Sequence, residues 1–526
     1  GGGEMRFINE FTPARRWIAA GMLLCLCAAA GCKKKQGDDP MSDQIAEEKS
    51  PVKMRALTIP SKGADRVDIR ILFNSGSVDD PEGKEGLTYM TAKMMAEGGT
   101  KKYAYHELIG LLYPMAADID VSVDKEMTVF EGRVHRDHAG KYFPLLLQVL
   151  LEPRFAQDDF TRIKDETLNY IRKNLRQADD ELLSKEALDV WIYEDHPYGH
   201  VVEGTVKGLE SITLEDIKEH YNRIITRDRL TVGLAGAVDD ELKTMVEDKL
   251  TGLVEKGAPA PGIPEPGMPE GIEVRIVEKT TDSTAIAMGV PVSLKRGHLD
   301  FYPLMLAFSC LGEHRQSMGR LFRTIREARG LNYGDYAYIE HFIQEGWTTK
   351  PMVNVARTRQ EMSVWIRPVQ NKHSLIALKL ALFELKKFVE KGLTLDEFDR
   401  TKGFLMGYTR VLEESLARRL GYGLDDLFYK TPSHLSGARK AFETMTLKQV
   451  NDAIATNIKI DSLKIVIITQ NGDVLKKQLA DNKAPAFDYD TPKAQAIHDE
   501  DKEILKYDPG FKNEKINVMP VDSLFE

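Results

Sequence analysis

Apolar and polar positions alternate along the chain with two different periods, which predict interleaved strands and helices. An alternating period places successive side chains on opposite faces of a strand, and a spacing of three and four places them on one face of a helix. Strands are predicted at residues 67–73, 127–134, 230–235, 285–290 and 463–468, and helices at 86–96 and 301–311. No Gly-x-Gly-x-x-Gly or Walker loop accompanies them. The pattern therefore favours an α+β sandwich over a Rossmann sheet.

The two halves of the chain repeat one pattern. The residues that recur with the same spacing are Phe160, Arg162, Lys164, Tyr170 and Arg172 in the first half and Phe398, Arg400, Lys402, Tyr408 and Arg410 in the second. Residues 257–271, rich in proline and glycine, have no hydrophobic period and are predicted to form a linker. We therefore predict an N-terminal domain at 53–256, the linker at 257–271, a C-terminal domain at 272–485 and a C-terminal extension at 486–526.

The first 52 residues are predicted to be an export signal and a tether. A basic flank precedes an apolar run at 17–30, which is shorter than the roughly 20 residues that a spanning helix needs. The run ends in Ala29-Ala30-Gly31-Cys32, which resembles the lipobox of bacterial lipoproteins although Ala29 stands where leucine is usual. This resemblance implies a signal peptide at 1–31, an acylated Cys32 and a tether at 32–52. The expected location is the bacterial periplasm, with a lipid anchor in the outer membrane in preference to the inner. An ordinary signal peptide with an incidental cysteine is the alternative.

Composition adds two constraints. The formal net charge of −9 offers no basic stripe for a phosphate backbone, so nucleic acid is not an expected partner. Cys310 is the one cysteine outside the signal region, so no disulfide is expected within the mature chain. It lies in an apolar run and is predicted to be a small core residue.

Three motifs resemble the M16 (insulinase-like) peptidase family. They are the run at 74–100, the His196-Pro-Tyr-Gly199 turn with Gly204-Thr205 after it, and Arg326-Glu-Ala-Arg-Gly-Leu-Asn-Tyr333. The resemblance implies two homologous α/β-sandwich domains of the LuxS and mitochondrial-processing-peptidase type, which face each other as a half-shell.

The zinc motif of the family is degenerate in this chain. Active members carry His-x-x-Glu-His on the first helix, and in register these three groups fall on Tyr89, Ala92 and Lys93. The distal glutamate of the family falls nearest to Tyr170. A phenol, a methyl group and an ammonium cannot replace two imidazoles and a general base. We therefore expect no catalytic residue, no metal and no cofactor in this chain. The other histidine pairs, His135/His138 and His196/His200, are predicted to be surface and turn residues.

The second half keeps an element that the resemblance associates with substrate binding. In the family, the residues that match Arg326 and Tyr333 reach the substrate near the zinc. Their donors could stabilise charge developing on the scissile carbonyl. The alternative is a solvated arginine and a packed tyrosine. Arg329, in the same element, is expected to affect turnover little when it is changed to alanine.

These observations predict the non-catalytic subunit of a heterodimeric periplasmic metallopeptidase. Its partner would be an M16 chain that bears His-x-x-Glu-His and zinc, its substrate a peptide, and its contact with the membrane a lipid anchor. Two alternatives stay open. One is an M16-derived structural or peptide-binding lipoprotein with no role in proteolysis, and the other is a homo-oligomeric hydrolase with unrelated chemistry.

Overall fold

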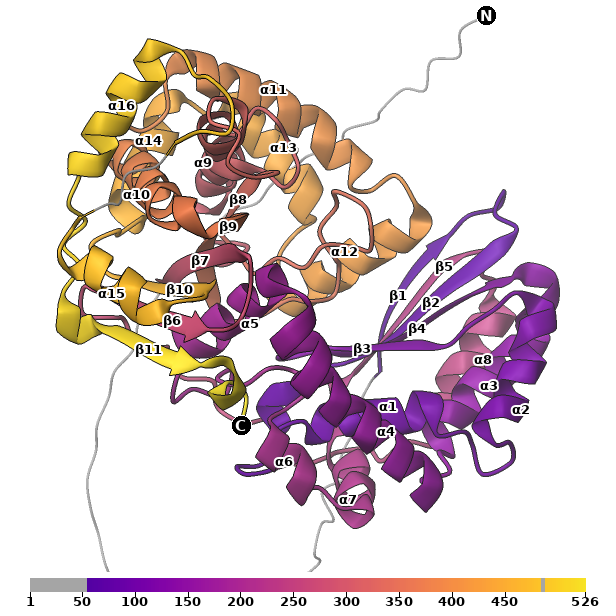
Figure 1. The fold of residues 1–526 in the computed structure, drawn as a ribbon. Helices are drawn as coiled ribbons and strands as arrows, with labels where there is room; N and C mark the ends of the chain where they lie inside the picture. The colour runs from indigo at the N-terminus through magenta and orange to yellow at the C-terminus, as the bar shows by residue number, and fades with distance from the viewer. Residues whose placement is uncertain (1–53, 484–487) are drawn as a thin grey trace, which may run out of the picture. The chain divides into compact units, whose positions relative to one another are not determined.

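The computed structural model describes residues 54–483 and 488–526 (Figure 1). The predicted signal peptide, the lipidation residue Cys32 and the predicted tether lie outside the described residues. Among the helices of the described ranges, none combines the length and the apolar character needed to cross a bilayer.

The first half is built on a five-stranded mixed sheet in the order β1-β5-β2-β4-β3. Its strands are β1 (Arg55–Pro60), β2 (Arg66–Phe73), β3 (Asp120–Val123), β4 (Thr128–His135) and β5 (Leu230–Gly236). Its helices are α1 (Leu87–Glu97), α2 (Tyr105–Leu112), α3 (Ala139–Leu151), α4 (Gln157–Asn169), α5 (Asp180–Ile192), α6 (Val206–Ser211), α7 (Leu214–Ile224) and α8 (Asp240–Leu250), and a π-helical segment, Tyr170–Ala178, continues α4.

The second half is built on a six-stranded sheet in the order β11-β6-β10-β7-β9-β8. Its strands are β6 (Ile272–Glu278), β7 (Ser283–Val292), β8 (Asp335–Tyr338), β9 (Gln360–Gln370), β10 (Leu463–Thr469) and β11 (Ile516–Pro520). Its helices are α9 (Phe301–Gly312), α10 (Ser374–Lys391), α11 (Leu395–Val411), α12 (Leu416–Tyr429), α13 (His434–Thr444), α14 (Leu447–Asn457), α15 (Gly472–Ala480) and α16 (Gln495–Lys506), and Phe322–Glu327 is π-helical.

The two halves share one topology. Without β11, the second sheet repeats the strand order of the first, and in both the first and last strands of the half pair in parallel. Side-chain contacts recur as well. Lys164 donates to the carbonyls of Glu210 and Ile212, at 2.8 and 2.9 Å, just before the Thr213 cap of α7. Lys402 donates in the same way to the two equivalent carbonyls before the Thr446 cap of α14. The structure supports the duplication that the repeated spacing predicts.

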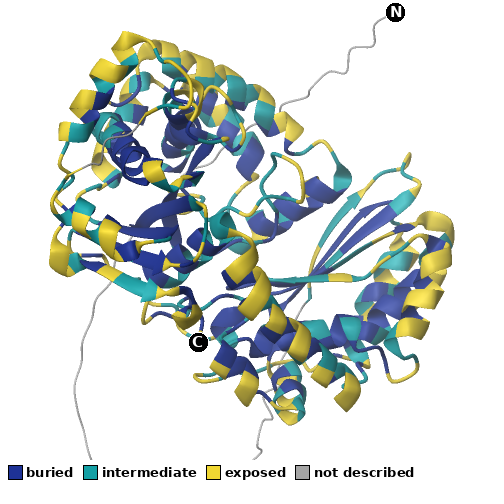
Figure 2. Ribbon diagram, in the orientation of Figure 1, coloured by how far each residue is buried: buried dark blue, intermediate teal, exposed yellow. Residues whose placement is uncertain are grey.

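One helix from each half packs on the sheet of the other half. Helix α5 of the first half packs on β7 and β10, and α12 of the second half packs on β5, β1 and β2 (Figure 1). Glycines in the strands allow the close approach. A Cβ at Gly233 would lie 3.1 Å from Leu420 of α12, and one at Gly289 would lie 3.1 Å from Ile192 of α5. The central strands β5 and β10 are buried along their whole length for this reason (Figure 2).

The C-terminal extension is part of the second domain. Strand β11 extends the second sheet by pairing in parallel with β6. Beyond it, Leu524 and Phe525 enter the apolar core that α5 shares with the second sheet. The carbonyl of Leu524 accepts a hydrogen bond from Arg176 of the first half, and Val206 donates its N–H to the carbonyl of Phe525 at 2.9 Å. The chain end therefore joins both halves.

The predicted elements are present with small shifts at their ends. Helix α1 begins at Leu87 after Gly86, whose φ of 101° suits glycine, and α9 covers the predicted 301–311. Residues 257–271 contain no helix or strand. Cys310 is buried, as predicted, and burial raises the pKa of its thiol to about 11, so it stays protonated.

Candidate functional site

The degenerate zinc motif on α1 combines one buried position, Ala92, with two half-buried ones, Tyr89 and Lys93. Ala92 is 1% exposed and belongs to the core of the first half, so this position faces apolar side chains. Lys93 forms an ion pair with Glu97, one turn along the helix, and its ammonium lies 6.0 Å from the Tyr89 ring centroid. A positively charged group therefore stands where the second histidine of the zinc motif would be.

Tyr89 and Tyr170 lie close enough to influence each other. Burial raises the pKa of both phenols, and the carboxylate of Glu203 raises it further in each case. Tyr89 itself adds to the shift at Tyr170. Helix α4, which ends just before Tyr170, packs on α1, so the structure brings the predicted distal position near the motif helix. Both phenols are protonated at neutral pH and are poor ligands for a cation.

Arg326 and Tyr333 form an exposed pair at one edge of the second half. The guanidinium of Arg326 lies 4.7 Å from the Phe322 ring and 6.0 Å from the Tyr333 ring. Tyr333 is 77% exposed. In the part of the chain that the structure describes, no carboxylate pairs with Arg326. The element is π-helical at Phe322–Glu327, and Gly330, with a φ of 70°, turns the chain toward Tyr333.

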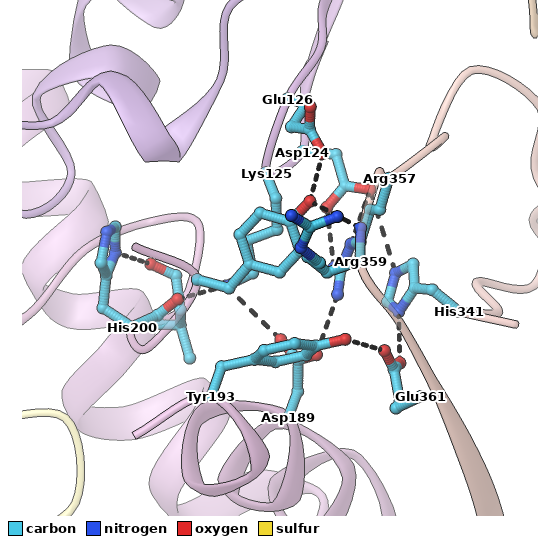
Figure 3. A network of polar contacts seen from close by, with 12 residues as sticks. Asp124, Lys125, Glu126, Asp189, Tyr193, His200, His341, Arg357, Arg359 and Glu361 are labelled. Atoms are coloured by element: carbon cyan, nitrogen blue, oxygen red, sulfur yellow. Dashed lines mark hydrogen bonds and ion pairs between the residues drawn. The ribbon is translucent and has the colours of Figure 1, made fainter. Parts of the chain in front are cut away.

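A buried polar network joins the two halves around Arg357 (Figure 3). Its guanidinium donates to Asp124, in the β3–β4 turn, at 2.8 Å and to Asp189, on α5, at 2.9 Å. Arg357 and Asp124 are 2% and 3% exposed. Burial disfavours ionisation of both aspartates, but Arg357 outweighs it, so their pKa values lie below the ordinary value. Both carboxylates are therefore charged at neutral pH.

A second layer of the network surrounds Glu361 on β9. Tyr193, directly after α5, donates to Oε2 of Glu361 at 2.6 Å, and Nδ1 of His341 lies 3.3 Å from Oε1. Nε2 of His341 lies 4.0 Å from Asp124 and has no hydrogen-bond partner. These contacts again cross from the first half to the second (Figure 3).

A pocket of about 380 Å³ opens beside this network, between α5 and residues 341–344. Besides Asp189, His341 and Glu361, it is lined by Glu186 and Glu203. Burial raises the pKa of Glu186 to about 7, helped by the neighbouring Asp189 and Glu203 carboxylates. Burial also raises the pKa of Glu203. Neither glutamate forms an ion pair with a lysine or arginine among the described residues.

The sequence did not predict this pocket. Its residues come from segments far apart in the chain, and the only local signal is the spacing of three between Glu186 and Asp189, which places both on one face of α5. The histidines considered from sequence lie elsewhere. His135 is exposed, and His196 is nearly buried, with Nε2 3.0 Å from the carbonyl of Pro264 in the linker.

Two models of one family match the chain. The insulinase (peptidase family M16) model matches residues 55–206, and the model described as the peptidase M16 inactive domain matches residues 211–405. The chain belongs to peptidase family M16. As the sequence predicted, it combines an M16 N-terminal domain with an M16 C-terminal domain in an α+β fold.

Known M16 proteins resemble this member over most of its length. A protein of Helicobacter pylori named non-peptidase homolog YmxG is 22% identical over 409 residues, which cover 76% of this chain and 88% of the relative. The uncharacterized zinc protease YmxG of Bacillus subtilis is 23% identical, with 78% and 94% covered. A crystal structure of a peptidase M16 inactive domain from Pseudomonas fluorescens superposes with a TM-score of 0.70 at 23% identity, covering 79% of this chain and 95% of that one.

The residues at the zinc position agree with an inactive M16 member. Tyr89, Ala92, Lys93 and Tyr170 supply neither the ligands nor the general base of the family. The name of the Helicobacter relative, non-peptidase homolog, agrees with an inactive zinc position. This chain is therefore an M16 homologue whose own zinc position does not fit the metal.

Proposed function

We propose that this M16 chain is the zinc-less subunit of a two-chain peptidase and supplies Arg326 and Tyr333 to the zinc site of its partner. The partner would be an M16 chain with His-x-x-Glu-His. The observation that carries the proposal is the exposed Arg326–Tyr333 pair. Its donors have no hydrogen-bond acceptor among the described residues, while the zinc position of the chain lacks the ligands and the general base of the family.

The chemistry of the pair suits peptide hydrolysis. When water attacks a peptide carbonyl, negative charge develops on the oxygen. A guanidinium and a phenol side by side are hydrogen-bond donors for that oxygen. The partner's zinc would supply the activated water. This chain would bind and orient the substrate without taking part in the proton transfers.

The same proposal includes a lipid anchor at Cys32 and a periplasmic location. Its support is the sequence of the first 32 residues: a basic flank, a short apolar run and Ala-Ala-Gly-Cys. The polar residues that follow would leave the folded part free to meet soluble peptides and the partner.

Reconstitution tests the proposal. The purified chain alone is expected to cleave no peptide, and addition of an M16 chain with His-x-x-Glu-His, encoded beside it, should produce peptide cleavage that a chelator abolishes. Size-exclusion chromatography should show both chains in one complex. Efficient cleavage by this chain alone, or full activity of the partner without it, would contradict a shared site. A complex that binds peptide without cleaving it would favour the peptide-binding alternative.

A further inference from the structure

Three donor groups converge at the pocket between the halves. One carboxylate oxygen each from Asp189 and Glu361 and one ring nitrogen of His341 lie within 4.8 Å of one another. In residues 54–483 and 488–526, no other group of His, Cys, Asp or Glu donors meets this distance. Asp189 comes from α5 of the first half, and His341 and Glu361 come from the second half.

The carboxylates are oriented as metal ligands usually are. Oδ1 of Asp189 accepts from Arg357 at 2.9 Å, and Oε2 of Glu361 accepts from Tyr193 at 2.6 Å. The second oxygen of Glu361, Oε1, lies 3.3 Å from Nδ1 of His341, and the second oxygen of Asp189, Oδ2, lies 3.4 Å from the ammonium of Lys125. Outer hydrogen bonds of this kind fix ligand carboxylates in metal sites. The ion would be held by Nδ1 of His341, the ring nitrogen beside Glu361, while the other ring nitrogen, Nε2, is buried and lies 4.0 Å from Asp124.

The carboxylates around the pocket outnumber the cations, so a bound metal ion would balance the excess negative charge. Arg357 is shared by Asp124 and Asp189, and Lys125 lies 3.4 Å from Asp189. These two cations face the carboxylates of Asp124 and Asp189, and three more, Glu361, Glu186 and Glu203, line the pocket without a lysine or arginine partner in the described structure. Glu186 lies one turn before Asp189 on α5 and would be the fourth ligand of the ion. Lys125 is the nearest competitor of a bound ion.

We propose that Asp189, His341 and Glu361 bind one divalent metal ion of the Mn²⁺ class between the two halves of the chain. One imidazole with two or three carboxylates is an oxygen-rich set without thiolate, which suits Mn²⁺. Because the ligands come from both halves, the ion clamps them together. The site is separate from the degenerate M16 zinc position. It departs from the sequence prediction of no metal and does not depend on the proposed function.

Manganese titration of the full chain tests the site. The full chain, freed of metal with a chelator and dialysed, is titrated with Mn²⁺ and free Mn²⁺ is followed by its six-line electron paramagnetic resonance signal. We expect one bound ion per chain and a higher melting temperature with Mn²⁺ than without it. No binding at millimolar Mn²⁺, or binding that leaves the melting temperature unchanged, would overturn the proposal.

Variants locate the ion. His341→Gln and Glu361→Gln should each weaken Mn²⁺ binding by roughly tenfold or more, whereas His138→Gln, a change at a histidine outside the site, should not. Glu186→Gln breaks no hydrogen bond recorded for the described residues and serves if the first two variants do not fold. It should weaken binding as well. Lys125→Met should tighten binding, because it removes the competing ammonium. Unchanged affinity in His341→Gln and Glu361→Gln, or in Glu186→Gln where those two do not fold, would contradict the assignment.

Discussion

The buried guanidinium of Arg329 pairs with the carboxylate of Asp501 at 2.9 Å and so ties the Arg326–Tyr333 element to helix α16 of the C-terminal extension. A second bond of 2.9 Å runs to Glu500. The side chain of Arg329 is 0% exposed. The sequence suggests Arg329 only as a control for turnover and does not predict this structural role, which makes it unsuitable as a control. It holds the element in place from behind, while Arg326 points outward.

Arg329→Ala should destabilise the protein strongly. The change leaves Asp501 as a buried carboxylate without its cation, and loss of one partner of a buried pair typically costs about 3–5 kcal/mol. Urea denaturation of the full chain measures the effect. Arg323→Ala is the matched control, because Arg323 lies in the same element but is half exposed. An Arg329→Ala variant as stable as the Arg323→Ala variant would contradict the structural role.

Arg326→Ala and Tyr333→Phe should each lower the turnover of the reconstituted peptidase. Loss of one donor to a developing oxyanion typically costs about 2.7–4 kcal/mol, a hundred- to thousandfold in rate. Arg326→Lys should restore little, because an ammonium lacks the planar fork of a guanidinium. Peptide cleavage at saturating substrate gives the turnover.

Arg323→Ala is again the control for that measurement, and it should leave turnover within about twofold. Assembly and the zinc content of the complex should be the same in all four variants. If Arg326→Ala and Tyr333→Phe act only by dissociating the partner, the pair belongs to the interface and not to the substrate site.

Acid should destabilise the fold through buried neutral histidines. Burial lowers the pKa of His220 to about 3 and that of His314 to about 4, from 6.5. The folded state resists protonation while the unfolded state accepts it, so this contribution is complete above pH 6.5 and is lost as the pH falls toward 4. Each such histidine contributes about 1.4 kcal/mol per pH unit in that window.

The histidine prediction is checked by urea unfolding between pH 7.5 and 4.5. His220→Gln should flatten the dependence, even if it lowers stability at pH 7.5 by disturbing the 2.8 Å contact with Thr88. Replacement of the exposed His135 should leave the slope unchanged. A slope that is the same in wild type and His220→Gln would contradict the assignment.

Cys32 should be the modified N-terminus of the protein isolated from its native membrane. Two or three acyl chains on one residue, each buried methylene contributing about 0.8 kcal/mol, suffice for stable anchoring. Mass spectrometry of the N-terminal peptide measures the added mass. Cys32→Ser should release the chain into the soluble fraction. An unmodified N-terminus beyond residue 32, or extraction of the wild type by salt alone, would show an ordinary signal peptide.

The sequence predicted the fold better than the junction between its halves. Alternation at 67–73 and helical spacing at 86–96 are local signals, and β2 and α1 appear where they predict. The shared topology of the two halves also follows from the repeat, whereas the strand order itself was not predicted. The exchange of α5 and α12 has no such signal. Their apolar faces show that they are covered, but not by which sheet.

The same distinction applies to the sites. Tyr89, Ala92 and Lys93 could be read in register because the zinc motif is one continuous helix. Asp189, His341 and Glu361 are brought together only by the packing of the two halves, so their spacing in the chain carries no information. Arg329 and Arg326 are three residues apart, yet one is buried and the other exposed, because Arg326 lies in the π-helical segment and Arg329 lies in the turn that follows it, where regular helical spacing does not apply.

The exchange of α5 and α12 means that the peptide link between the halves is not what holds them together. A protease that cuts within 257–271 would leave each fragment with its helix on the sheet of the other. The nicked protein should stay one particle in gel filtration and separate only in denaturant. Either fragment produced by itself would expose a bare apolar sheet face, for which a second copy of the same fragment is the nearest cover.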